Sequence, residues 1–544
     1  MLATLGSGAA TTPFSQIVGT ELLFICGSNT AEAHPIVGLK VLEAVKKGTR
    51  LVVIDPRRTV VAALAEAQEG GIWLRLRPGT NIPLLNGILR VIFEEGLANE
   101  EFIRERTEGV EAVKAHVMDY ELSQVEEITG VPVEQIREAA RAYANAGTAL
   151  ILYGLGVVEH RGGTAGVMAL ANLVLATGHV GRPHTGINPL RGQNNVQGAC
   201  DMGTLPYALP GYQHTDDEEA LKRFAMLWNV PELPVDPGLM EPQMYDEALR
   251  GNLRGLYVVG YDPAQTQGNI SHIHAALKAL DFLVVQDLFL TETARYAHVV
   301  LPAACFYEKD GTFTSGERRI RRVHKAVDPP WDTKPDWEIV CLISQAMGYP
   351  MFYVHPSQIM DEISQVTPSY AGVSYERIEG DGLVWPCPAS DHPGTALLHT
   401  ESFPIGKGRF VPVFPVFAEE DADRDFPLTL VTGRRLEHYN NASMTRRCEA
   451  FDRIAGKEFV EIHPQDAAGL GIEDGSRVVV ESRRGRVRAT ARVTERSRPG
   501  SVFMTFHFSE TPVNILTSPG LDTKTMTPEY KVCAVRVLPD DDAI

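Results

Sequence analysis

A βαβ pattern near the start of the chain constrains the fold more than any other part of the sequence. Residues 21–27 form an apolar run of buried-strand length, Pro35 opens a helix, and a strand over 51–54 ends at Asp55. Proline is favoured in the first turn of a helix, and an acid at a strand tip is where a Rossmann-like site holds a ribose hydroxyl. The glycine fingerprint GxGxxG is absent, so the segment is either half of a nucleotide site or an α/β layer that binds nothing.

The same order of elements returns in the middle of the chain. A strand over 255–260 is followed by a polar loop, a helix over about 270–280 and a strand over 282–286 that ends at Asp287. The likeness lies in the order of elements rather than in a sequence repeat. Two such units predict two Rossmann-like α/β domains with mostly parallel sheets, related by pseudo-symmetry, that bind two similar ligand halves face to face.

The last part of the chain changes character. Residues 380–427 are rich in proline and glycine, which predicts irregular wrapping and a domain boundary, and short alternating strands such as 477–481 and 486–493 follow. This pattern predicts a small C-terminal β-barrel. The predicted domains are therefore residues 1–192, 193–412 and 413–544. Within the first of them, helices are expected at about 81–95 and 163–178, with an acidic helical stretch over 99–146 between them.

The bulk composition excludes several classes of function. The 51 basic and 69 acidic residues give a net charge of −18, which argues against nucleic acid or an anionic membrane as the main partner. Seven scattered cysteines without a CxxC pair indicate a reducing compartment, the cytoplasm, and exclude a self-contained zinc or iron–sulfur ligand set by spacing. No apolar run is long enough to span a membrane. Since no hydrolytic triad can be defended, a bound cofactor that carries the chemistry is the natural inference.

One polar stretch concentrates the groups that could bind a substrate. Four side-chain amides and Arg191 lie within the seven residues 191–197, and glycines bracket them. Amides and a guanidinium offer fixed donors and acceptors, which suit planar partners and carboxylates. The alternative is a polar loop that caps a helix starting near Cys200. Cys200 itself is expected to be a buried, unreactive thiol.

The motifs around this stretch carry a family resemblance. The run from Arg191 to Gly203, continued by Leu205-Pro206 and 210–213, is similar to the corresponding loop of formate dehydrogenases. The whole chain resembles, collinearly, the catalytic (alpha) subunit of formate dehydrogenases in the molybdopterin oxidoreductase family. Other matching points are His34-Pro35, Asp55-Pro56-Arg57, Gly260, Asp262-Pro263, Gln286-Asp287, Glu308-Lys309, 311–314, His438-Tyr439 and 528–531.

The resemblance implies a cofactor and the residues that hold it. The family binds molybdenum or tungsten through two molybdopterin guanine dinucleotides, one for each α/β domain, and the barrel closes over them. By matching position, one dinucleotide is served by Asn29, Glu32, Asp55 and Arg57, and the other by Gly260, Asp262, Thr266, Gln286, Asp287 and Asp336. Gln193 and Asn194 would lie near the pterin and the metal, and the barrel would contribute Arg434, His438, Tyr439, Asn514, Tyr530 and Lys531. No metal-ligating residue is assigned in this chain.

The resemblance also implies a reaction, the interconversion of formate and carbon dioxide. Arg191 matches the arginine beside the metal, and its fork can pair both oxygens of formate at any working pH. It would also orient the C–H bond toward the metal. Two alternatives remain open: a non-catalytic cofactor-binding or scaffold subunit of a redox complex, and a related molybdopterin reductase of another oxyanion.

Two features of the family are absent from this sequence. Its members carry cysteines for a [4Fe–4S] cluster and then a cysteine or selenocysteine that binds the metal, upstream of a segment resembling 2–9. We expect an in-frame selenocysteine codon just before this reading frame, so that the chain is a selenoprotein fragment, or else a naturally split enzyme. The implied partners are the N-terminal remainder or a split partner, together with electron-transfer subunits. The chain alone is expected to be inactive.

Overall fold

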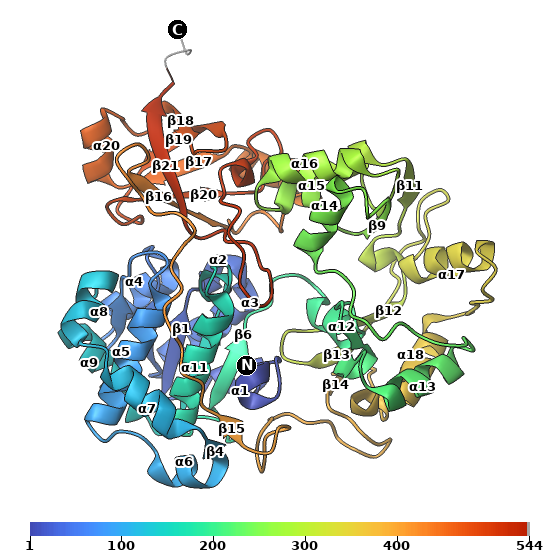
Figure 1. The fold of residues 1–544 in the computed structure, drawn as a ribbon, viewed down its shortest axis with the longest axis horizontal. Helices are drawn as coiled ribbons and strands as arrows, with labels where there is room; N and C mark the ends of the chain where they lie inside the picture. The colour runs from blue at the N-terminus through green and yellow to red at the C-terminus, as the bar shows by residue number, and fades with distance from the viewer. Residues whose placement is uncertain (541–544) are drawn as a thin grey trace. The chain divides into compact units, whose positions relative to one another are not determined.

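The computed structural model describes residues 1–540 and consists of two compact units. Unit 1 combines Met1–Leu190, Gln265–Ser271 and the chain from Leu397 onward, and unit 2 combines Arg191–Ala264 with His272–Ala396. Figure 1 shows the elements of both units with their labels. Among the described residues, no helix is both long and apolar enough to cross a membrane.

Unit 1 contains a five-stranded sheet in the order β3-β2-β1-β5-β6, and all its neighbouring strands are parallel. Its strands are β1 (Leu22–Cys26), β2 (Arg50–Ile54), β3 (Ile72–Leu74), β5 (Ala149–Tyr153) and β6 (Gly186–Pro189). All five residues of β1 and of β5 are buried. Continuous apolar strands are required in a parallel sheet because helices cover both of its faces.

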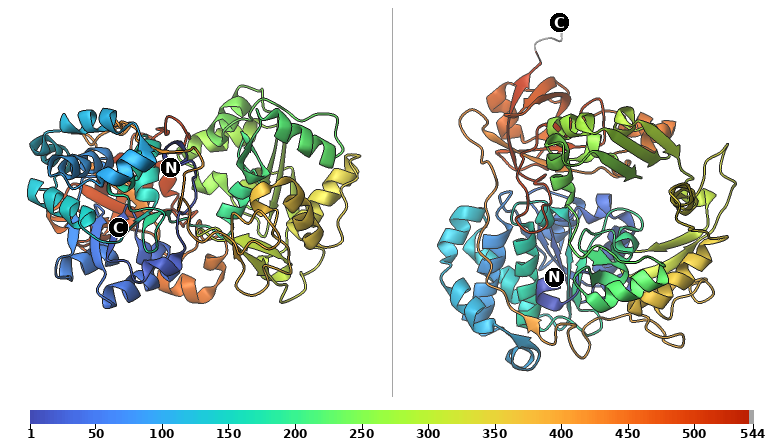
Figure 2. Two further views of the ribbon diagram at one scale, coloured as in Figure 1. Left: turned by 90° about the horizontal axis from the view of Figure 1, so that it is seen from below. Right: turned by 45° about the vertical axis from the view of Figure 1, so that its right-hand side comes forward.

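Alternate residues of β1 belong to two different cores. Phe24 packs in a cluster with α5, α9 and α11, whereas Leu23 and Ile25 pack in a cluster with α3 and α4. Figures 1 and 2 show these helices flanking the blue strands. The helices of this region are α1 (Leu2–Leu5), α2 (Thr30–Ala33), α3 (Pro35–Lys46), α4 (Val60–Ala67), α5 (Asn81–Glu94), α6 (Glu100–Arg106), α7 (Val110–Met118), α8 (Leu122–Thr129), α9 (Val133–Ala144), α10 (Leu155–Val158) and α11 (Gly163–Thr177).

The C-terminal part of unit 1 is a closed barrel. Its strand order is β16-β20-β17-β19-β18-β21, so every strand has two hydrogen-bonded neighbours. The strands are β16 (Leu428–Gly433), β17 (Phe459–Ile462), β18 (Arg477–Glu481), β19 (Arg486–Val493), β20 (Ser501–Thr505) and β21 (Cys533–Pro539), with helices α19 (Glu449–Ala455) and α20 (Pro464–Leu470). Alternate residues of β18, Val478 and Val480, point into the apolar interior. Closure removes the free strand edges that an open sheet would expose.

Unit 2 contains a three-stranded parallel sheet in the order β11-β10-β9 and an antiparallel sheet of β12, β13 and β14. Leu283 and Val285 of β10 pack against α14 and α16 on one face, whereas Tyr257 and Phe282 are exposed on strands of the same sheet. The strands are β7 (Ala208–Leu209), β8 (Gln213–His214), β9 (Gly255–Val259), β10 (Phe282–Asp287), β11 (Val299–Pro302), β12 (Gly311–Thr314), β13 (Arg319–Val323) and β14 (Leu383–Val384). The helices are α12 (Val196–Asp201), α13 (Glu218–Leu227), α14 (Glu241–Leu249), α15 (Pro263–Thr266), α16 (Ile270–Ala279), α17 (Asp336–Ala346) and α18 (Pro356–Val366), and α15 and α16 each include residues of unit 1.

The predicted fold class, α/β with parallel sheets and a C-terminal barrel, is confirmed. The expected helical stretch 99–146 consists of four helices, and Gly109 and Gly130 adopt left-handed conformations at two of the three breaks between them. Two expectations about the polar loop are corrected. The helix expected near Cys200 begins at Val196, after Asn195 turns the chain with a φ of 61°. Cys200 is half-buried rather than buried.

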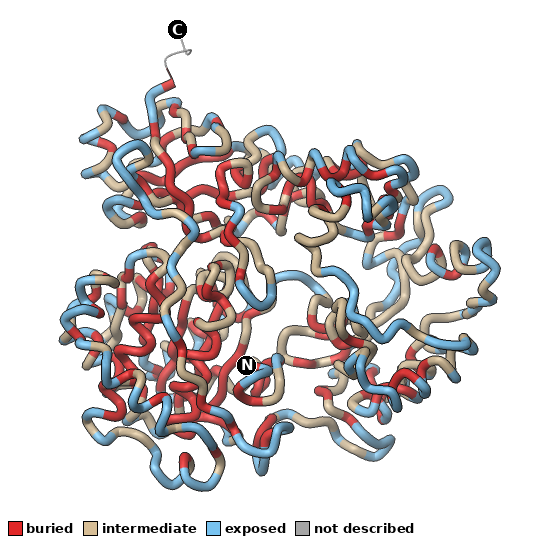
Figure 3. Tube along the Cα trace, viewed as in Figure 1, coloured by how far each residue is buried: buried red, intermediate tan, exposed pale blue. Residues whose placement is uncertain are grey.

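The core of unit 1 makes a stability prediction. Phe24 is fully buried, and its ring meets that of Tyr143 edge-on at 5.3 Å. Figure 3 shows the buried residues concentrated along the strands of the parallel sheet and along α11. Phe24→Ala should lower the free energy of unfolding by about 3–5 kcal/mol, the cost of a large core cavity. Chemical denaturation measures the effect, and Phe417→Ala, at a side chain that is 55% exposed, is the matched control. Equal effects of the two changes would contradict this packing.

Candidate cofactor and substrate site

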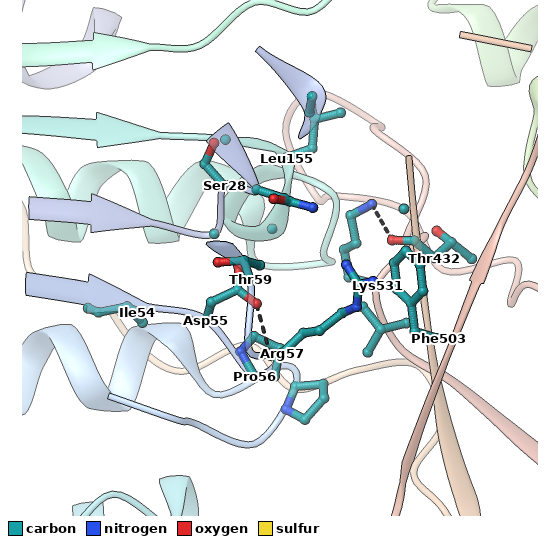
Figure 4. A pocket seen from close by; sticks show the side chains of 18 of the residues that line it. Ser28, Ile54, Asp55, Pro56, Arg57, Thr59, Leu155, Thr432, Phe503 and Lys531 are labelled. Atoms are coloured by element: carbon teal, nitrogen blue, oxygen red, sulfur yellow. Dashed lines mark hydrogen bonds between the residues drawn. The ribbon is translucent and has the colours of Figure 1, made fainter. Parts of the chain in front are cut away.

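A pocket of about 850 Å³ lies within unit 1, where the carboxyl ends of β1 and β2 face the barrel. Figure 4 shows Asp55 and Arg57 from the sheet opposite Thr432, Phe503 and Lys531 from the barrel. Ligands of open α/β sheets bind outside the carboxyl ends of the strands, which is where this pocket lies.

Two backbone segments that line this pocket, at Gly27 and at Gly156, lie unusually close to each other. Gly27 has a φ of 58°, and a Cβ at this residue would lie 2.6 Å from the carbonyl carbon of Gly156. No larger residue fits at Gly27, so the loop after β1 approaches a ligand without side chains in the way. Beside it, Asn29 Oδ1 is buried and has no hydrogen-bond partner among residues 1–540. A buried acceptor of this kind fits a donor supplied by a ligand.

The carboxyl group of Asp55 stands at the tip of β2, as the sequence predicted. It is 8% exposed and accepts a hydrogen bond from the Arg57 backbone N–H at 2.9 Å. Burial raises its pKa to about 6, against the opposing effects of that hydrogen bond and of the charges of Arg57 and Lys531. A carboxylate with capacity to spare in a buried site suits a ligand that brings hydroxyl or N–H donors.

Lys531 and His160 complete the polar lining from two sides. Lys531 Nζ donates to the Thr432 carbonyl at 2.9 Å and forms an ion pair with Glu159 at 2.8 Å. His160 Nε2 lies 2.9 Å from the Gly156 carbonyl oxygen, and burial lowers the pKa of His160 to about 4. The imidazole is therefore neutral near pH 7, and the Lys531 ammonium is a cation of the lining whose charge Glu159 balances.

Two of the predicted cofactor residues form ion pairs with residues of the barrel region, and one of them, Arg57, also lines the pocket. The Arg57 guanidinium forms a bidentate pair with Glu461 at 2.7 and 2.8 Å and stacks on Phe503 at 3.8 Å. Burial lowers the pKa of Arg57, but the hydrogen bonds and charge of Glu461 outweigh this and leave it raised. Glu32 pairs with Arg496 at 2.7 Å. Neither Glu461 nor Arg496 could be predicted as a partner, because pairs more than 400 residues apart leave no local pattern in the sequence.

The barrel residues assigned by resemblance are spread over several positions of unit 1. Arg434 lines the pocket. His438 is buried, and both its ring nitrogens have partners, Thr445 Oγ1 at 3.1 Å and the Ala455 carbonyl at 2.8 Å. Tyr439 is 39% exposed. Asn514 donates to the Thr266 carbonyl at 2.7 Å, and the Tyr530 hydroxyl contacts Gln267 and the Gly268 N–H, both at 3.2 Å.

The second predicted set gathers at the carboxyl edge of the parallel sheet in unit 2. Gln286 donates to Asp336 at 2.7 Å, and Lys309 pairs with the same carboxylate. Asp262 accepts from the N–H and hydroxyl of Thr293 at 2.8 and 2.6 Å. Burial raises the pKa of Asp287, and the charges of Asp262 and Asp336 add to the rise. Gly260, with a φ of 59°, turns the chain between β9 and this edge.

The amide-rich loop lies at the start of unit 2. Gln193 and Asn194 are exposed, and Arg191 is half-buried. Arg191 Nη1 lies 3.6 Å from Cys200 Sγ, its buried Nε has no partner among residues 1–540, and within that range the guanidinium forms no ion pair. An arginine whose N–H groups are not paired with a carboxylate of the protein can donate them to a carboxylate of a ligand.

Comparison with known proteins places this geometry in a family. Residues 4–346 match the family described as molybdopterin oxidoreductase, and residues 428–534 match the one described as "Molydopterin dinucleotide binding domain". The chain belongs to the molybdopterin oxidoreductase family. The family assignment and the resemblance to formate dehydrogenase alpha subunits are thereby confirmed.

Relatives of this family member match over almost its whole length. It is 47% identical over 536 residues to the F420-dependent formate dehydrogenase 2 subunit alpha of Methanococcus maripaludis, covering 98% of this chain and 78% of that one. It is 40% identical over 545 residues to formate dehydrogenase H of Escherichia coli, covering 99% and 76%. The structure of acetylene hydratase from Pelobacter acetylenicus matches with a TM-score of 0.74 at 19% identity, covering 99% and 80%, which shows a common fold.

The residues of the unit 1 pocket fit a molybdopterin cofactor, the group that the matched domain supports. The closely approaching backbone at Gly27, the orphaned Asn29 acceptor, the buried Asp55 carboxyl and the Lys531 cation are donors and acceptors suited to a nucleotide. Five of the residues assigned by resemblance line this pocket. Arg57 is paired with Glu461 through two hydrogen bonds, and the other four are Asn29, Asp55, Arg434 and Lys531.

The raised pKa of Asp55 predicts how stability depends on pH. Because the folded state holds the proton more tightly, the protein without cofactor should lose stability as the pH rises from about 4 to 6, by about 3 kcal/mol for a pKa raised from 3.8 to about 6. Asp55→Asn should remove this loss, raising the free energy of unfolding at pH 7. Urea denaturation from pH 4 to 7 measures it, with Asp421→Asn at an exposed carboxyl as control. An unchanged pH profile in Asp55→Asn would show that Asp55 is not the group responsible.

Proposed function

We propose that this protein is the catalytic part of a molybdopterin formate dehydrogenase that interconverts formate and carbon dioxide. The observation that carries the proposal is Arg191, whose fork is free of any carboxylate partner in the described chain, within a loop shared in pattern with formate dehydrogenases. The names of the relatives from Methanococcus maripaludis and Escherichia coli support the same reaction.

The cofactor proposed is molybdenum or tungsten held by two molybdopterin guanine dinucleotides. One dinucleotide would lie in the unit 1 pocket beside Asn29, Asp55 and Lys531, and the other at the edge formed by Gln286, Asp287 and Asp336. The division into domains at 1–192, 193–412 and 413–544 is part of this proposal, and so are Gln193 and Asn194 near the pterin. When bound, the metal group accepts the two electrons that formate gives up.

The chain's own contribution to the reaction is binding and orientation. The Arg191 guanidinium remains charged at any working pH and presents two parallel N–H donors to the two oxygens of formate. Holding both oxygens fixes the direction of the C–H bond. Aligning two reacting groups accounts for a large part of the barrier, so this orientation lowers the barrier. Electron-transfer subunits would then receive the electrons. A cytoplasmic location is proposed because all seven cysteines are free thiols.

Formate-dependent dye reduction by the purified holoprotein, with its physiological partners, tests this function. Activity together with bound molybdenum or tungsten and pterin would support it. Cofactor without formate turnover, but with reduction of another oxyanion, would favour the related reductase, and neither activity would favour a scaffold subunit.

A substitution at Arg191 tests the residue's role. Arg191→Lys should lower turnover per bound metal by about 10²-fold. An ammonium cannot pair both oxygens of formate, so the substrate binds in a shifted position. Arg321→Lys, at an exposed arginine of the same unit, is the control and should keep full activity. Near-normal turnover in Arg191→Lys at unchanged metal content would refute the clamp.

A further inference from the structure

A buried carboxylate lies at the end of the helix that follows the Arg191 loop. Asp201 is 1% exposed and closes α12. Its Oδ1 accepts hydrogen bonds from Gln197 Nε2 at 2.7 Å and from the Tyr212 hydroxyl at 2.8 Å, and its Oδ2 accepts one from the Tyr370 hydroxyl at 2.6 Å. Neither the reaction proposed above nor the cofactor sites use this group.

All three donors to Asp201 are neutral. Hydrogen bonds to the charged form favour a carboxylate over a carboxylic acid. Burial raises the pKa of Asp201, whereas the hydrogen bonds from Tyr370, Gln197 and Tyr212 and the charge of Arg191 oppose the rise. The Asp201 carboxyl therefore accepts its hydrogen bonds from neutral groups, and no ion pair joins it to Arg191 among residues 1–540. Arg191 Nη1 lies 3.6 Å from the Sγ of Cys200, the residue before Asp201, so the two charged groups are near enough to act on each other. The buried Arg318 guanidinium is a second cation on which the charge of Asp201 acts.

The opposite end of α12 is fixed as well. Asn195 adopts a left-handed conformation, and its Oδ1 accepts the Thr314 N–H at 2.9 Å. Gly198 lies so close to this side chain that a Cβ there would be 2.1 Å from Asn195 Oδ1. Both ends of α12 are thus held by contacts within unit 2. These contacts fix the direction in which the backbone of residues 191–195 leads into the helix.

This arrangement can orient Arg191 and still leave its N–H groups available to a substrate. A carboxylate in direct contact with Arg191 would hold the guanidinium in place but would occupy the fork that an anionic substrate needs. A carboxylate whose two oxygens already accept hydrogen bonds from three other donors attracts the guanidinium while competing less for its N–H groups. Such an arrangement combines orientation with an open binding face.

We propose that Asp201 is a positioning residue, which orients Arg191 toward an anionic substrate through a charge that Gln197, Tyr212 and Tyr370 keep from pairing with it. This inference rests on the proposed function for the identity of the substrate, formate. It does not rest on that function for the placement of Arg191.

Two variants separate the charge of Asp201 from its hydrogen bonds. Asp201→Asn removes the charge, so Arg191 loses its orientation, and kcat should fall about tenfold while the KM for formate stays within about twofold. Tyr370→Phe keeps the charge but frees Oδ2 to compete for the guanidinium, so the KM should rise about tenfold with kcat within about twofold. Asp328→Asn, at a carboxyl that is 89% exposed, is the control for the same chemical change. Activities are expressed per bound metal.

A measurement independent of activity uses phenylglyoxal, which modifies accessible arginines. The rate of modification of Arg191, followed by peptide mass spectrometry on the full protein, should rise about fivefold in Asp201→Asn and fall below the wild-type rate in Tyr370→Phe. Unchanged rates in both variants, or kcat and KM both within twofold of wild type in Asp201→Asn, would overturn the proposal. If Asp201→Asn does not fold, Tyr370→Phe alone decides, and an unaltered KM and modification rate there reject it. Absence of formate turnover in the wild-type protein would defeat the proposed function, while the modification rates would still decide the positioning role.

Discussion

The buried ion pair between Arg57 and Glu461 is the interaction on which unit 1 depends. It joins the tip of β2 to barrel strand β17, and the face of Phe503 covers the guanidinium. Removing one partner of a buried pair leaves an uncompensated charge, which costs about 3–5 kcal/mol. The pair therefore fixes one side of the pocket, where the sheet edge and barrel residues meet, and Arg496 adds a contact from Glu32 beside it.

Charged groups in this protein fall into two arrangements with different consequences. Arg57 and Glu461 satisfy each other and hold the structure. Asp55 and Asp201 are buried carboxyl groups whose hydrogen-bond donors are neutral, the Arg57 backbone N–H in one case and an amide and two hydroxyls in the other. The first arrangement neutralises charge, whereas the second leaves an electric field that a ligand or a neighbouring cation experiences. Asp55 lines the candidate cofactor pocket of unit 1, and Asp201 ends the helix that follows the Arg191 loop.

The sequence predicted the strands of the fold more completely than the long-range contacts of the candidate site residues. β1, β5 and the barrel strands β18 and β19 were predictable because apolar runs and alternating patterns are local signals. Asp55 was predictable for the same reason, since it follows directly on a buried strand. The partners of Arg57 and Asp201 were not, because Glu461 and Tyr370 lie 404 and 169 residues away and no local spacing records them. The burial of His438 between backbone and side-chain partners was likewise invisible in its motif.

We propose two separate nucleotide-binding edges in this chain, one with Asp55 and one with Gln286 and Asp336, each for one guanine nucleotide of the cofactor. The most direct measurement is the amount of guanine nucleotide that acid hydrolysis releases from the purified holoprotein, relative to its molybdenum or tungsten. The account predicts two guanine nucleotides for each metal ion. A ratio of one would contradict the second edge, and metal without any guanine nucleotide would contradict both.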